Sequence, residues 1–388
     1  MPGDDGAGPG NEHTDGTLGV LWLIKGMGHG GAEQLLVLQA RHADHRSFRY
    51  TAAHVTPGRD ALAAALEAEG VPVRGLPGSP WRWPAAVRRL LRENEIHVVH
   101  VHSPAVAAVV RPTLRTVPRA RRPGLVVTEH NSWRAFHPVT RWANALTYGL
   151  DDATLAVSPD VRDSVWPLWR GRVETLVHGI DLGALADAAG HRAQVRRSLG
   201  LQDGDVAAVT VANFRPEKAY PDLLRAARTA LDRCDRLVFL VVGQGPLEAE
   251  VRREAERLRL GDRFRILGHR TDVLDLLAAS DLFVLASRHE GFPVAVMEAL
   301  ASGLPVVSTR VGGLPEAVTP DVEGLLVEPG RPDALADAVV ALARDAGRRA
   351  VMAEHARRRG GRFDVRTAVR RLEEIYRVVA TAPPSSVS

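Results

Sequence analysis

Apolar runs and amphipathic stretches alternate along the chain. The apolar runs of the first half are short and rich in β-branched residues, and they predict strands at Leu18–Ile24, Arg49–Val55, Val71–Arg74, His97–His102, Leu125–Glu129, Ala153–Val157 and Glu174–Val177. Helices are expected between them, beginning near Ala32, Asp60, Pro84, Pro104, Pro138 and Pro159. Proline is favoured in a first helical turn because the N–H group that it lacks would have no partner there. Strands that alternate with helices are typical of a parallel sheet covered by helices.

The alternation restarts after the segment His178–Asp181. A polar helical stretch reaches about Leu201, and the apolar runs beyond it predict strands at Val206–Val211, Leu237–Val242, Phe264–Leu267, Leu282–Leu285 and Pro305–Ser308. Helices are expected at Pro221–Arg233, Pro246–Arg259, Val273–Ala279, Val294–Ala301, Pro332–Ala343 and Arg366–Ala380. The sequence therefore predicts an α/β fold of two facing, Rossmann-like, doubly wound domains joined near residue 182. Such sheets bind ligands beyond the carboxyl ends of their strands, so we expect a site in a central cleft.

The composition agrees with two globular domains. The chain has 388 residues, more than one core usually spans, with 45% hydrophobic and 25% charged residues. Its single cysteine, Cys234, excludes a disulfide framework. Residues 1–16 lack the basic and apolar regions of a signal peptide, and no apolar run is long enough to span a membrane. We expect a disordered tail at each end and a cytoplasmic location.

Positive charge is concentrated between Val71 and Arg122, where ten arginines face only two acidic residues. One interpretation is a set of solvated helix surfaces. The other is a contact with an anionic acceptor or an anionic membrane surface, with Trp81 and Trp83 at its edge. The residues expected to make that contact are Arg82, Arg88, Arg89 and Arg92. No nucleic-acid-binding motif accompanies the charge, so we expect no nucleic-acid partner.

A glycine-rich loop, Gly26-Met27-Gly28-His29-Gly30-Gly31, follows the first expected strand and opens a helix. Such a loop lets an anionic group approach backbone N–H groups at the positive end of a helix. The spacing of Gly26, Gly28 and Gly31 also fits the dinucleotide fingerprint, but the second strand does not end in the acidic residue that would hold a ribose. The loop is therefore either a phosphate-contacting loop or a plain tight turn, and a dehydrogenase is disfavoured.

Two charged loops in the second half carry the clearest candidate chemistry. Arg215 and Lys218 follow the first strand of the second domain, where an arginine fork and a lysine point charge suit a diphosphate. Glu290 lies in a loop before a helix, and Glu298 lies inside that helix. The first carboxylate can accept hydrogen bonds from sugar hydroxyls and the second from vicinal ribose hydroxyls, while helix N-terminal amides meet the phosphate. Taken singly, each of these residues could equally be a surface charge.

Three histidines, His97, His100 and His102, lie on one expected strand. No carboxylate or thiol completes a metal-ligand set with them in the sequence, so we expect no metal site.

The order and spacing of these motifs, with Gly312-Gly313-Leu314-Pro315-Glu316 after them, resemble glycosyltransferase family four, whose members have the GT-B fold and retain the configuration of the transferred sugar. The resemblance covers nearly the whole chain, strongly in the second half and loosely in the first. It implies that residues 17–181 form an acceptor-side domain, that residues 182–365 bind the nucleotide sugar, and that a helix at 366–380 crosses back to the first domain before a tail at 381–388.

The resemblance also implies a role for each candidate residue. Arg215 and Lys218 would hold the donor diphosphate, Glu290 the transferred sugar and Glu298 the ribose. Gly291, Phe292 and Pro293 at the helix start, and Gly30 and Gly31 in the first loop, would also lie against the donor. His130 would lie near the reacting sugar. The family usually has glycine after the lysine, whereas this chain has Ala219, so we expect that no positive φ is needed there.

The sequence thus predicts a retaining transfer of a sugar from a UDP- or GDP-linked donor to a hydroxyl acceptor, without a metal ion or other cofactor. The acceptor is expected to belong to the biosynthesis of a cell-surface polysaccharide, a glycolipid or a secondary metabolite, and to be anionic or lipid-linked, with peripheral contact to the inner membrane face. Three alternatives stay open. They are a sugar-nucleotide epimerase of the same fold, a non-catalytic nucleotide-sugar-binding protein and, least favoured, an NAD-binding dehydrogenase.

Overall fold

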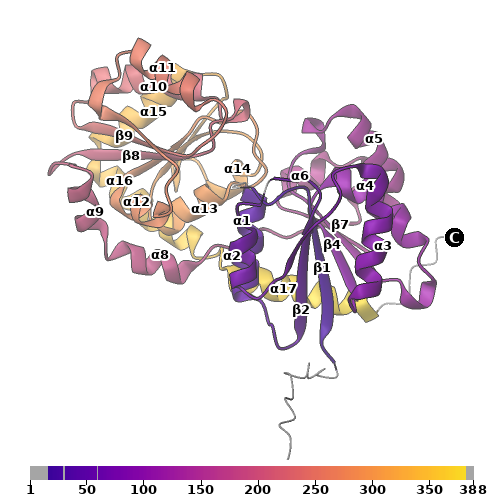
Figure 1. The fold of residues 1–388 in the computed structure, drawn as a ribbon. Coiled ribbons are helices and arrows are strands. Elements are labelled where there is room, and N and C mark those ends of the chain that lie inside the picture. The colour runs from indigo at the N-terminus through magenta and orange to yellow at the C-terminus, as the bar shows by residue number, and fades with distance from the viewer. Residues whose placement is uncertain (1–15, 29–30, 59, 382–388) are drawn as a thin grey trace, which may run out of the picture.

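The computed structural model describes residues 16–28, 31–58 and 60–381. They form two parallel β-sheets, each covered by helices and each in its own domain, as Figure 1 shows. This confirms the expected α/β class with two Rossmann-like domains. Of the tails predicted at 1–16 and 381–388, residues 1–15 and 382–388 lie outside the described residues, as does Gly30 in the first loop, whereas Thr381 is the last residue of a helix.

The first sheet has seven strands in the order β3-β2-β1-β4-β5-β6-β7. The strands are β1 (Leu18–Ile24), β2 (Phe48–His54), β3 (Val73–Gly75), β4 (Val98–Val101), β5 (Gly124–Glu129), β6 (Ala153–Ala156) and β7 (Val173–Thr175). The helices between them are α1 (Gly31–His42), α2 (Ala63–Ala68), α3 (Trp83–Glu93), α4 (Pro104–Arg115), α5 (Pro138–Thr147), α6 (Pro159–Ser164) and α7 (Pro167–Arg170). Because β1 and β4 are neighbours, the connections diverge at their carboxyl ends, which is the switch point of this sheet.

The second sheet has six strands in the order β10-β9-β8-β11-β12-β13. They are β8 (Val206–Val211), β9 (Leu237–Val242), β10 (Phe264–Gly268), β11 (Leu282–Leu285), β12 (Val306–Thr309) and β13 (Gly324–Val327). The helices of this domain are α8 (Leu182–Ala189), α9 (Arg192–Ser198), α10 (Tyr220–Arg233), α11 (Glu248–Arg257), α12 (Val273–Ala279), α13 (Val294–Ala301), α14 (Leu314–Ala317), α15 (Pro332–Arg344) and α16 (Ala346–Gly360). Its switch point lies between β8 and β11.

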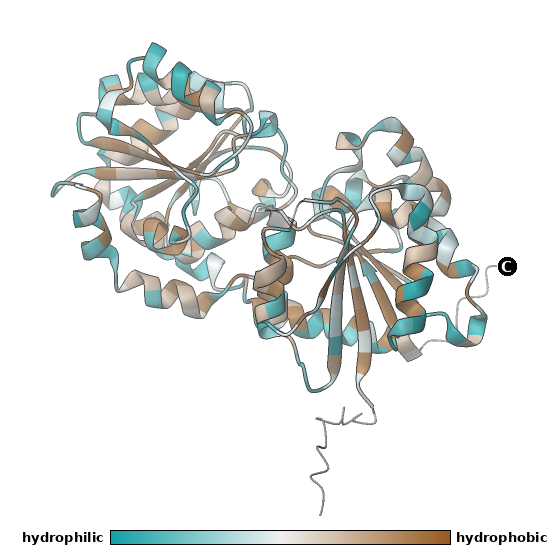
Figure 2. Ribbon diagram, in the orientation of Figure 1, coloured by the Kyte–Doolittle hydropathy of each residue, from teal (hydrophilic) through white to brown (hydrophobic). Residues whose placement is uncertain are grey.

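Burial explains why the strands form where the apolar runs predict them. The central strands are apolar on both faces because helices cover both sides of each sheet, and Figure 2 shows apolar residues along the strands with polar residues on the outer helix faces. Every residue of β9 is buried. A strand of this kind reads as a continuous apolar run in the sequence.

The last helix, α17 (Val365–Thr381), packs against α1, β4 and β5 of the first domain. Trp22 of β1 donates its indole N–H to the hydroxyl of Tyr376 on α17 at 3.1 Å. Just before α17, Ile180 forms a β-bridge with Asp364, where the chain passes between the domains for the second time. None of the helices in the described ranges is both long and apolar enough to cross a membrane.

The structure corrects one backbone expectation and adds elements that the apolar pattern does not predict. Ala219 adopts a left-handed conformation with φ 49° and ψ 46°, so the expectation that no positive φ is needed after Lys218 was wrong. The conformation is required because the 3₁₀ turn Pro216–Lys218 must reverse direction before α10 begins. The unpredicted elements are α7, α14, α16 and β13.

Candidate active site

The two charged loops of the second domain meet at the switch point of its sheet. The loop after β8 carries Arg215 and Lys218, and the loop after β11 carries Glu290. A backbone hydrogen bond of 2.8 Å from the N–H of Arg288 to the carbonyl of Glu217 ties the loops together. Parallel neighbouring strands end at one edge of the sheet, which is why residues 72 positions apart come into contact.

Lys218 and Glu290 form an ion pair. The Lys218 ammonium lies 2.7 Å and 2.8 Å from the two carboxylate oxygens of Glu290, and the hydroxyl of Ser287 donates to the first of them at 2.5 Å. The side chains are only 20% and 7% exposed, so the charges are largely removed from water. Such a pair adds little net stability, because burying both charges costs about as much as their attraction returns.

Lysine is rare in this chain, which makes Lys218 unusual. The chain contains only two lysines, Lys25 and Lys218, and uses arginine at its other cationic positions. A compact ammonium is therefore retained here in a chain that otherwise uses the guanidinium. Arg215 lies three residues earlier and is exposed, and among the described residues no hydrogen bond or ion pair is recorded for its guanidinium. The loop thus presents one cation held by a carboxylate and one that can turn toward a ligand.

Glycine permits the close backbone contacts around Glu290. A Cβ atom on Gly291 would lie 2.2 Å from the carbonyl oxygen of His130 in the first domain, so no other residue fits there without a shift of the backbone. Gly312 has φ +54°, and a Cβ on it would lie 2.0 Å from the carbonyl oxygen of Glu290. The N–H of Gly313 donates to the carbonyl of Gly291 at 2.7 Å. The Glu290 loop is therefore clasped between His130 and the Gly312–Gly313 turn.

The other predicted residues of this loop lie at the start of α13. Phe292 is buried and packs in the core, where its ring contacts Phe363 edge-on, so its side chain supports the loop. Pro293 is the N-cap residue, and the helix begins at Val294 with N–H groups that have no partner within the helix. Glu298 lies in the second turn of α13, and burial raises the pKa of its carboxyl to about 7.

A row of histidines lies on the first-domain side. Nδ1 of His102, just after β4, is 3.1 Å from Nε2 of His130, just after β5. The His130 ring stacks on that of His178, in the segment that leaves the first domain, with centroids 5.2 Å apart and planes 13° from parallel. Burial lowers the pKa of His130 to about 4, and burial together with the neighbouring imidazoles holds those of His102 and His178 well below their usual value. All three rings are therefore neutral near pH 7.

Both ring nitrogens of the neighbouring His100 have hydrogen-bond partners, whereas one ring nitrogen of His102 has none. His100 contacts the hydroxyl of Tyr376 through Nδ1 at 2.6 Å and that of Thr128 through Nε2 at 2.7 Å. Since Tyr376 already accepts from Trp22, its own proton is available for Nδ1, which leaves the proton of His100 on Nε2. Nε2 of His102, in contrast, is buried without a partner. Whichever of His102 and His130 donates in their shared bond, one further hydrogen bond can be made here.

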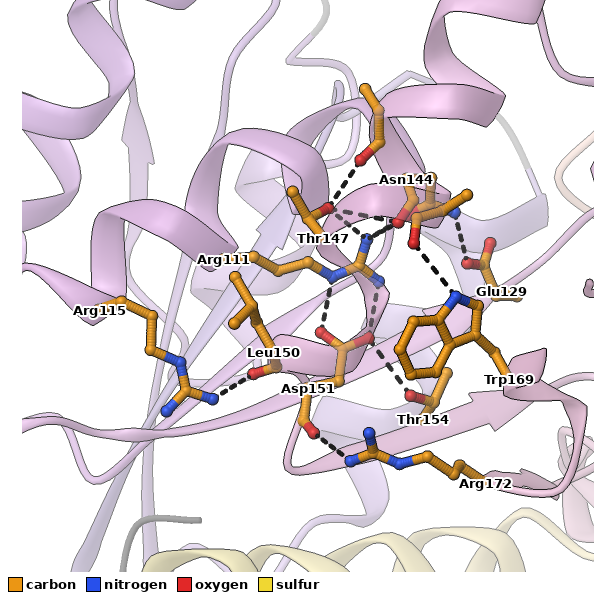
Figure 3. Close-up of polar contacts among 12 residues, drawn as sticks. Arg111, Arg115, Glu129, Asn144, Thr147, Leu150, Asp151, Thr154, Trp169 and Arg172 are labelled. Carbon is orange, nitrogen blue, oxygen red and sulfur yellow. Dashed lines mark hydrogen bonds and ion pairs between the residues drawn. The ribbon is translucent and has the colours of Figure 1, made fainter. Parts of the chain in front are cut away.

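A buried polar network supports the strand that carries His130 (Figure 3). Arg111 of α4 is fully buried and makes two hydrogen bonds, of 2.7 Å and 2.6 Å, to the carboxylate of Asp151. It also donates to the side chain of Asn144 on α5, whose amide donates to Glu129 at 3.0 Å. Glu129 is the last residue of β5, so the network fixes the strand end from which His130 projects. Burial raises the pKa of the Glu129 carboxyl.

The arginines predicted to meet an anionic acceptor are not part of either cluster. Arg88 donates from Nε and Nη2 to the Thr116 hydroxyl at 3.0 Å and 2.7 Å, and Arg89 pairs with Glu93 at 2.6 Å. Arg92 is exposed near the end of α3. The burial of Arg111 removes one of the ten arginines of this segment from the surface, so the sequence count overstates the surface charge.

The structure therefore brings together five of the predicted positions. Arg215, Lys218, Glu290 and Gly291 lie on the loops of the second domain, and the last of these meets His130. Gly31 begins α1 after β1, at the switch point of the first sheet, while Gly30 lies outside the described residues. Sequence reasoning missed His102 and His178 as neighbours of His130. A partial signal for His102 was present, because it ends the strand predicted at His97–His102 and His130 follows the strand predicted at Leu125–Glu129, but the pairing of these two strands was not part of that signal.

This arrangement can hold a polyanion on one side and neutral hydroxyl groups on the other. Two cations and a helix start provide the positive groups, and Glu290 and Glu298 can accept hydrogen bonds from hydroxyls. The neutral imidazoles can donate or accept a hydrogen bond without attracting an ion. Among the residues that the structure describes, no group of three or more histidine, cysteine, aspartate or glutamate side chains is placed to hold a metal ion.

Two family models match the chain one after the other. The model described as Glycosyltransferase Family 4 matches residues 29–184, and the model described as Glycosyl transferases group 1 matches residues 191–359. Together they leave only the two ends and a short joint unmatched. Both switch-point loops of the second domain fall inside the second match, and the histidine row falls inside the first.

Similar proteins point the same way. An N-acetyl-alpha-D-glucosaminyl L-malate synthase from Bacillus anthracis is 33% identical over 164 residues, which are 42% of this chain and 43% of the relative. A D-inositol 3-phosphate glycosyltransferase from Salinispora tropica is 35% identical over 221 residues, which are 53% of this chain and 46% of the relative. The matches span about half the length of these curated relatives.

The same fold occurs in solved structures. That of Anabaena HepE in complex with UDP superposes with a TM-score of 0.79 at 21% identity, covering 92% of this chain and 99% of that one. The likeness extends over both domains and their arrangement.

Proposed function

Because this chain belongs to glycosyltransferase family four, we propose that it transfers a sugar from a UDP- or GDP-linked donor to a hydroxyl group of an acceptor, with retention of configuration. The observation that carries the proposal is the Lys218–Glu290 pair at the switch point of the second sheet, beside the exposed Arg215 and the start of α13. Cations, a hydroxyl-binding carboxylate and free helix amides are the groups that a sugar diphosphate needs, and they lie within one pair of loops.

On the donor side, Arg215 and Lys218 hold the diphosphate, with the amides near Gly291, Phe292 and Pro293 at the start of α13. Lys218 exchanges part of its contact with Glu290 for phosphate oxygens, which frees a carboxylate oxygen for a sugar hydroxyl. Glu298 accepts the vicinal hydroxyls of the ribose. HepE is named in complex with UDP, which supports a uridine donor as the first candidate.

On the acceptor side, His130 lies near the reacting sugar, and Gly30 and Gly31 lie against both substrates. The names of the two relatives contain a malate and an inositol phosphate, both of them anionic molecules. They support an anionic acceptor here, in the biosynthesis of a cell-surface polysaccharide, a glycolipid or a secondary metabolite. Arg88, Arg89 and Arg92 of α3 are further candidate contacts of the acceptor. The location proposed for the protein is the cytoplasm, with peripheral attachment to the inner membrane face.

The difficult step is the departure of the nucleoside diphosphate. As the bond from the anomeric carbon to the phosphate oxygen breaks, negative charge grows on the diphosphate, and Arg215, Lys218 and the helix amides stabilise it. Each well-placed donor contributes about 3–4 kcal/mol to such a step. The acceptor oxygen bonds to the anomeric carbon on the same face, and its proton passes to the leaving phosphate oxygen. The cations take the role of a divalent metal, so no metal ion is required.

The test begins with thermal stabilisation by nucleoside diphosphate sugars, since a ligand at 100 times its dissociation constant adds about 2.7 kcal/mol. The stabilising donor is then incubated with hydroxyl acceptors, and release of the nucleoside diphosphate is measured with and without EDTA. We expect acceptor-dependent release that survives EDTA and is lost in Lys218→Ala. The matched control is Arg348→Ala, which removes a cation from the exposed pair with Asp321 in the same domain.

The same assay separates the alternatives. An epimerase would change the configuration of the donor sugar, and adding an acceptor would cause no release of nucleoside diphosphate. A non-catalytic binding protein would be stabilised by the donor and release nothing. Stabilisation by none of the donors, or equal turnover in Lys218→Ala and wild type, would contradict the proposal.

A further inference from the structure

An apolar stripe is exposed on α5 of the first domain. Val139, Trp142 and Leu146 are 70%, 55% and 80% exposed. Their spacing of three and four residues places them on one face of the helix. The opposite face carries Asn144 and Ala145, which are buried against the rest of the domain. The helix therefore packs on the domain through one face and turns a separate apolar face to solvent.

The stripe continues onto α7. The Trp142 ring meets that of Trp166, at the start of α7, edge-on at 4.8 Å. The indole N–H of Trp169 donates to the carbonyl of Ala145 at 3.1 Å, so the two helices lie side by side. Leu168, between these tryptophans, is 76% exposed. Val139, Trp142, Leu146 and Leu168 form what we call the α5–α7 patch.

The patch contains most of the exposed large apolar side chains of the described residues. Of the seven large apolar side chains that are exposed there, four belong to the α5–α7 patch, and the others are Trp81, Val351 and Val378. Single exposed apolar residues are common on soluble proteins and need no explanation. A cluster of four on adjacent helices is a mark of an interaction surface.

The two segments that form the patch contain basic but no acidic residues. No aspartate or glutamate occurs from His130 to Leu150 or from Ser164 to Val173. The same segments carry Arg134, Arg170 and Arg172, which are exposed, and Arg141, which is half-buried. In the described part of the chain no ion pair neutralises these four arginines, although Arg170 and Arg172 donate to the carbonyls of Val165 and Asp151, at 3.3 Å and 3.1 Å. The surface is apolar and cationic together.

We propose that the α5–α7 patch binds the surface of a lipid bilayer that contains anionic lipid. Tryptophan and leucine side chains enter the boundary between headgroups and acyl chains, and the arginines meet the anionic headgroups. A second copy of the chain fits the patch less well, because a two-fold contact sets the same arginines against each other. The bilayer satisfies both the apolar and the cationic part of the surface.

Membrane binding through the α5–α7 patch places the acceptor of the proposed function at the bilayer surface. Only this statement about the acceptor rests on the proposed function. The α5 helix begins eight residues after His130, so the patch belongs to the acceptor side of the site. Docking there brings the histidine row to the membrane that carries a lipid-linked or lipid-adjacent acceptor. Binding to vesicles needs no catalysis, so the two ideas fail in different experiments.

The test is co-sedimentation of the full chain with vesicles of phosphatidylcholine alone and of phosphatidylcholine mixed with phosphatidylglycerol. We expect binding to the mixed vesicles, little binding to the neutral ones, and a decrease with salt. Trp142→Glu/Leu146→Glu should lower binding at least about tenfold, and Arg134→Ser or Arg170→Ser about fivefold each. Val351→Glu, at a 61% exposed position in the second domain, should bind as wild type does.

Unchanged melting temperatures and unchanged nucleotide stabilisation show that the variants are folded. Wild type that ignores mixed vesicles at low salt overturns the proposal, as does full binding by Trp142→Glu/Leu146→Glu. Dimerisation that this double variant abolishes, without vesicle binding by wild type, assigns the patch to a second copy and overturns it too.

Discussion

The two sides of the candidate site are held together by different kinds of polar contact. On the second-domain side, the ion pair of Lys218 and Glu290 is charged and lies next to the exposed Arg215. On the first-domain side, His102, His130 and His178 are neutral rings joined by one hydrogen bond and by stacking. The close backbone contact of Gly291 with His130 links the two sides.

The difference matches the charges that the two substrates bring. A sugar diphosphate gains negative charge as it leaves, so fixed cations stabilise its departure. The attacking hydroxyl is neutral, and imidazoles that stay uncharged can orient it without competing for the diphosphate. If this division is right, substitutions of the cations on the charged side should act on binding and departure of the nucleotide. Substitutions on the neutral side should act on turnover alone.

The largest expected effect is on the charged side. Lys218→Ala should lower kcat/KM about 10²- to 10³-fold, because one stabilising donor for the leaving diphosphate is lost. It should also destabilise the fold by about 3 kcal/mol, because Glu290 is left buried without its partner. Lys218→Ala/Glu290→Gln should recover most of the stability and none of the activity. Turnover assays and thermal unfolding of the three variants measure both effects.

Glu290→Gln alone separates the roles within the pair. It keeps the size of the side chain and should lower turnover with little change in nucleotide affinity. A variant that loses nucleotide affinity in proportion to its turnover would place Glu290 on the diphosphate instead of the sugar. Arg348→Ala should leave both readouts as in wild type.

A smaller effect is expected on the neutral side. His102→Phe keeps a ring of similar size and removes the nitrogen that contacts His130, so kcat should fall about tenfold to hundredfold, because His130 is then less well oriented toward the reacting sugar. Donor KM should not change, and His102→Gln, which can still hydrogen-bond His130, should recover part of the loss. His191→Gln, at an exposed pair with Asp275, is the matched control. Equal changes in kcat and donor KM would mean that His102 only supports the fold.

The ionisation of Glu298 provides a third comparison. Burial raises its pKa to about 7, so below pH 7 the free protein holds a proton there that must leave before the carboxylate can accept ribose hydroxyls. Nucleotide affinity should therefore rise about tenfold from pH 6 to pH 8, with release of a proton. Titration calorimetry in two buffers measures both. In Glu298→Gln this part of the slope should vanish, and only the titration of the nucleotide should remain.

The same carboxyl affects stability in the opposite direction. Its pKa is about 7 in the folded chain and 4.5 ordinarily, so the folded state binds more protons between these values. Stability relative to Glu298→Gln is then highest below pH 4.5, falls as the pH rises toward 7, and stays constant above. A rise over this window would mean that the folded carboxyl is already ionised.

Much of the fold can be predicted from the sequence because the strands are buried on both faces. Runs such as Leu237–Val242 have no polar positions, and they stand out from the amphipathic helices around them. Elements without a clear apolar pattern could not be predicted in this way. α16 has a basic surface and small apolar residues, and β13 begins at a glycine, so neither has a strong period.

The candidate site divides in the same way. Residues that act from one loop, such as Arg215 with Lys218, are visible as a local motif. The contact of His102 with His130 depends on which strands are neighbours, and the α5–α7 patch depends on which face of α5 the domain leaves uncovered. No local pattern contains that information, because Val139 and Leu146 read as core positions of an ordinary helix. The arginines of α3 show the converse, since their number is visible in the sequence but their partners are not.

The smallest expected effect tests the backbone beside the charged pair. Ala219 has φ 49°, where a side chain costs roughly 1–2 kcal/mol and glycine costs nothing sterically. Glycine loses more chain entropy on folding, about 0.5–1 kcal/mol, so Ala219→Gly should stabilise the protein by no more than about 1 kcal/mol. Ala186→Gly, in the exposed middle of α8, should destabilise it by about that amount. If both variants are destabilised equally, the left-handed turn is not present in solution. In that case Lys218 reaches Glu290 by another path of the chain.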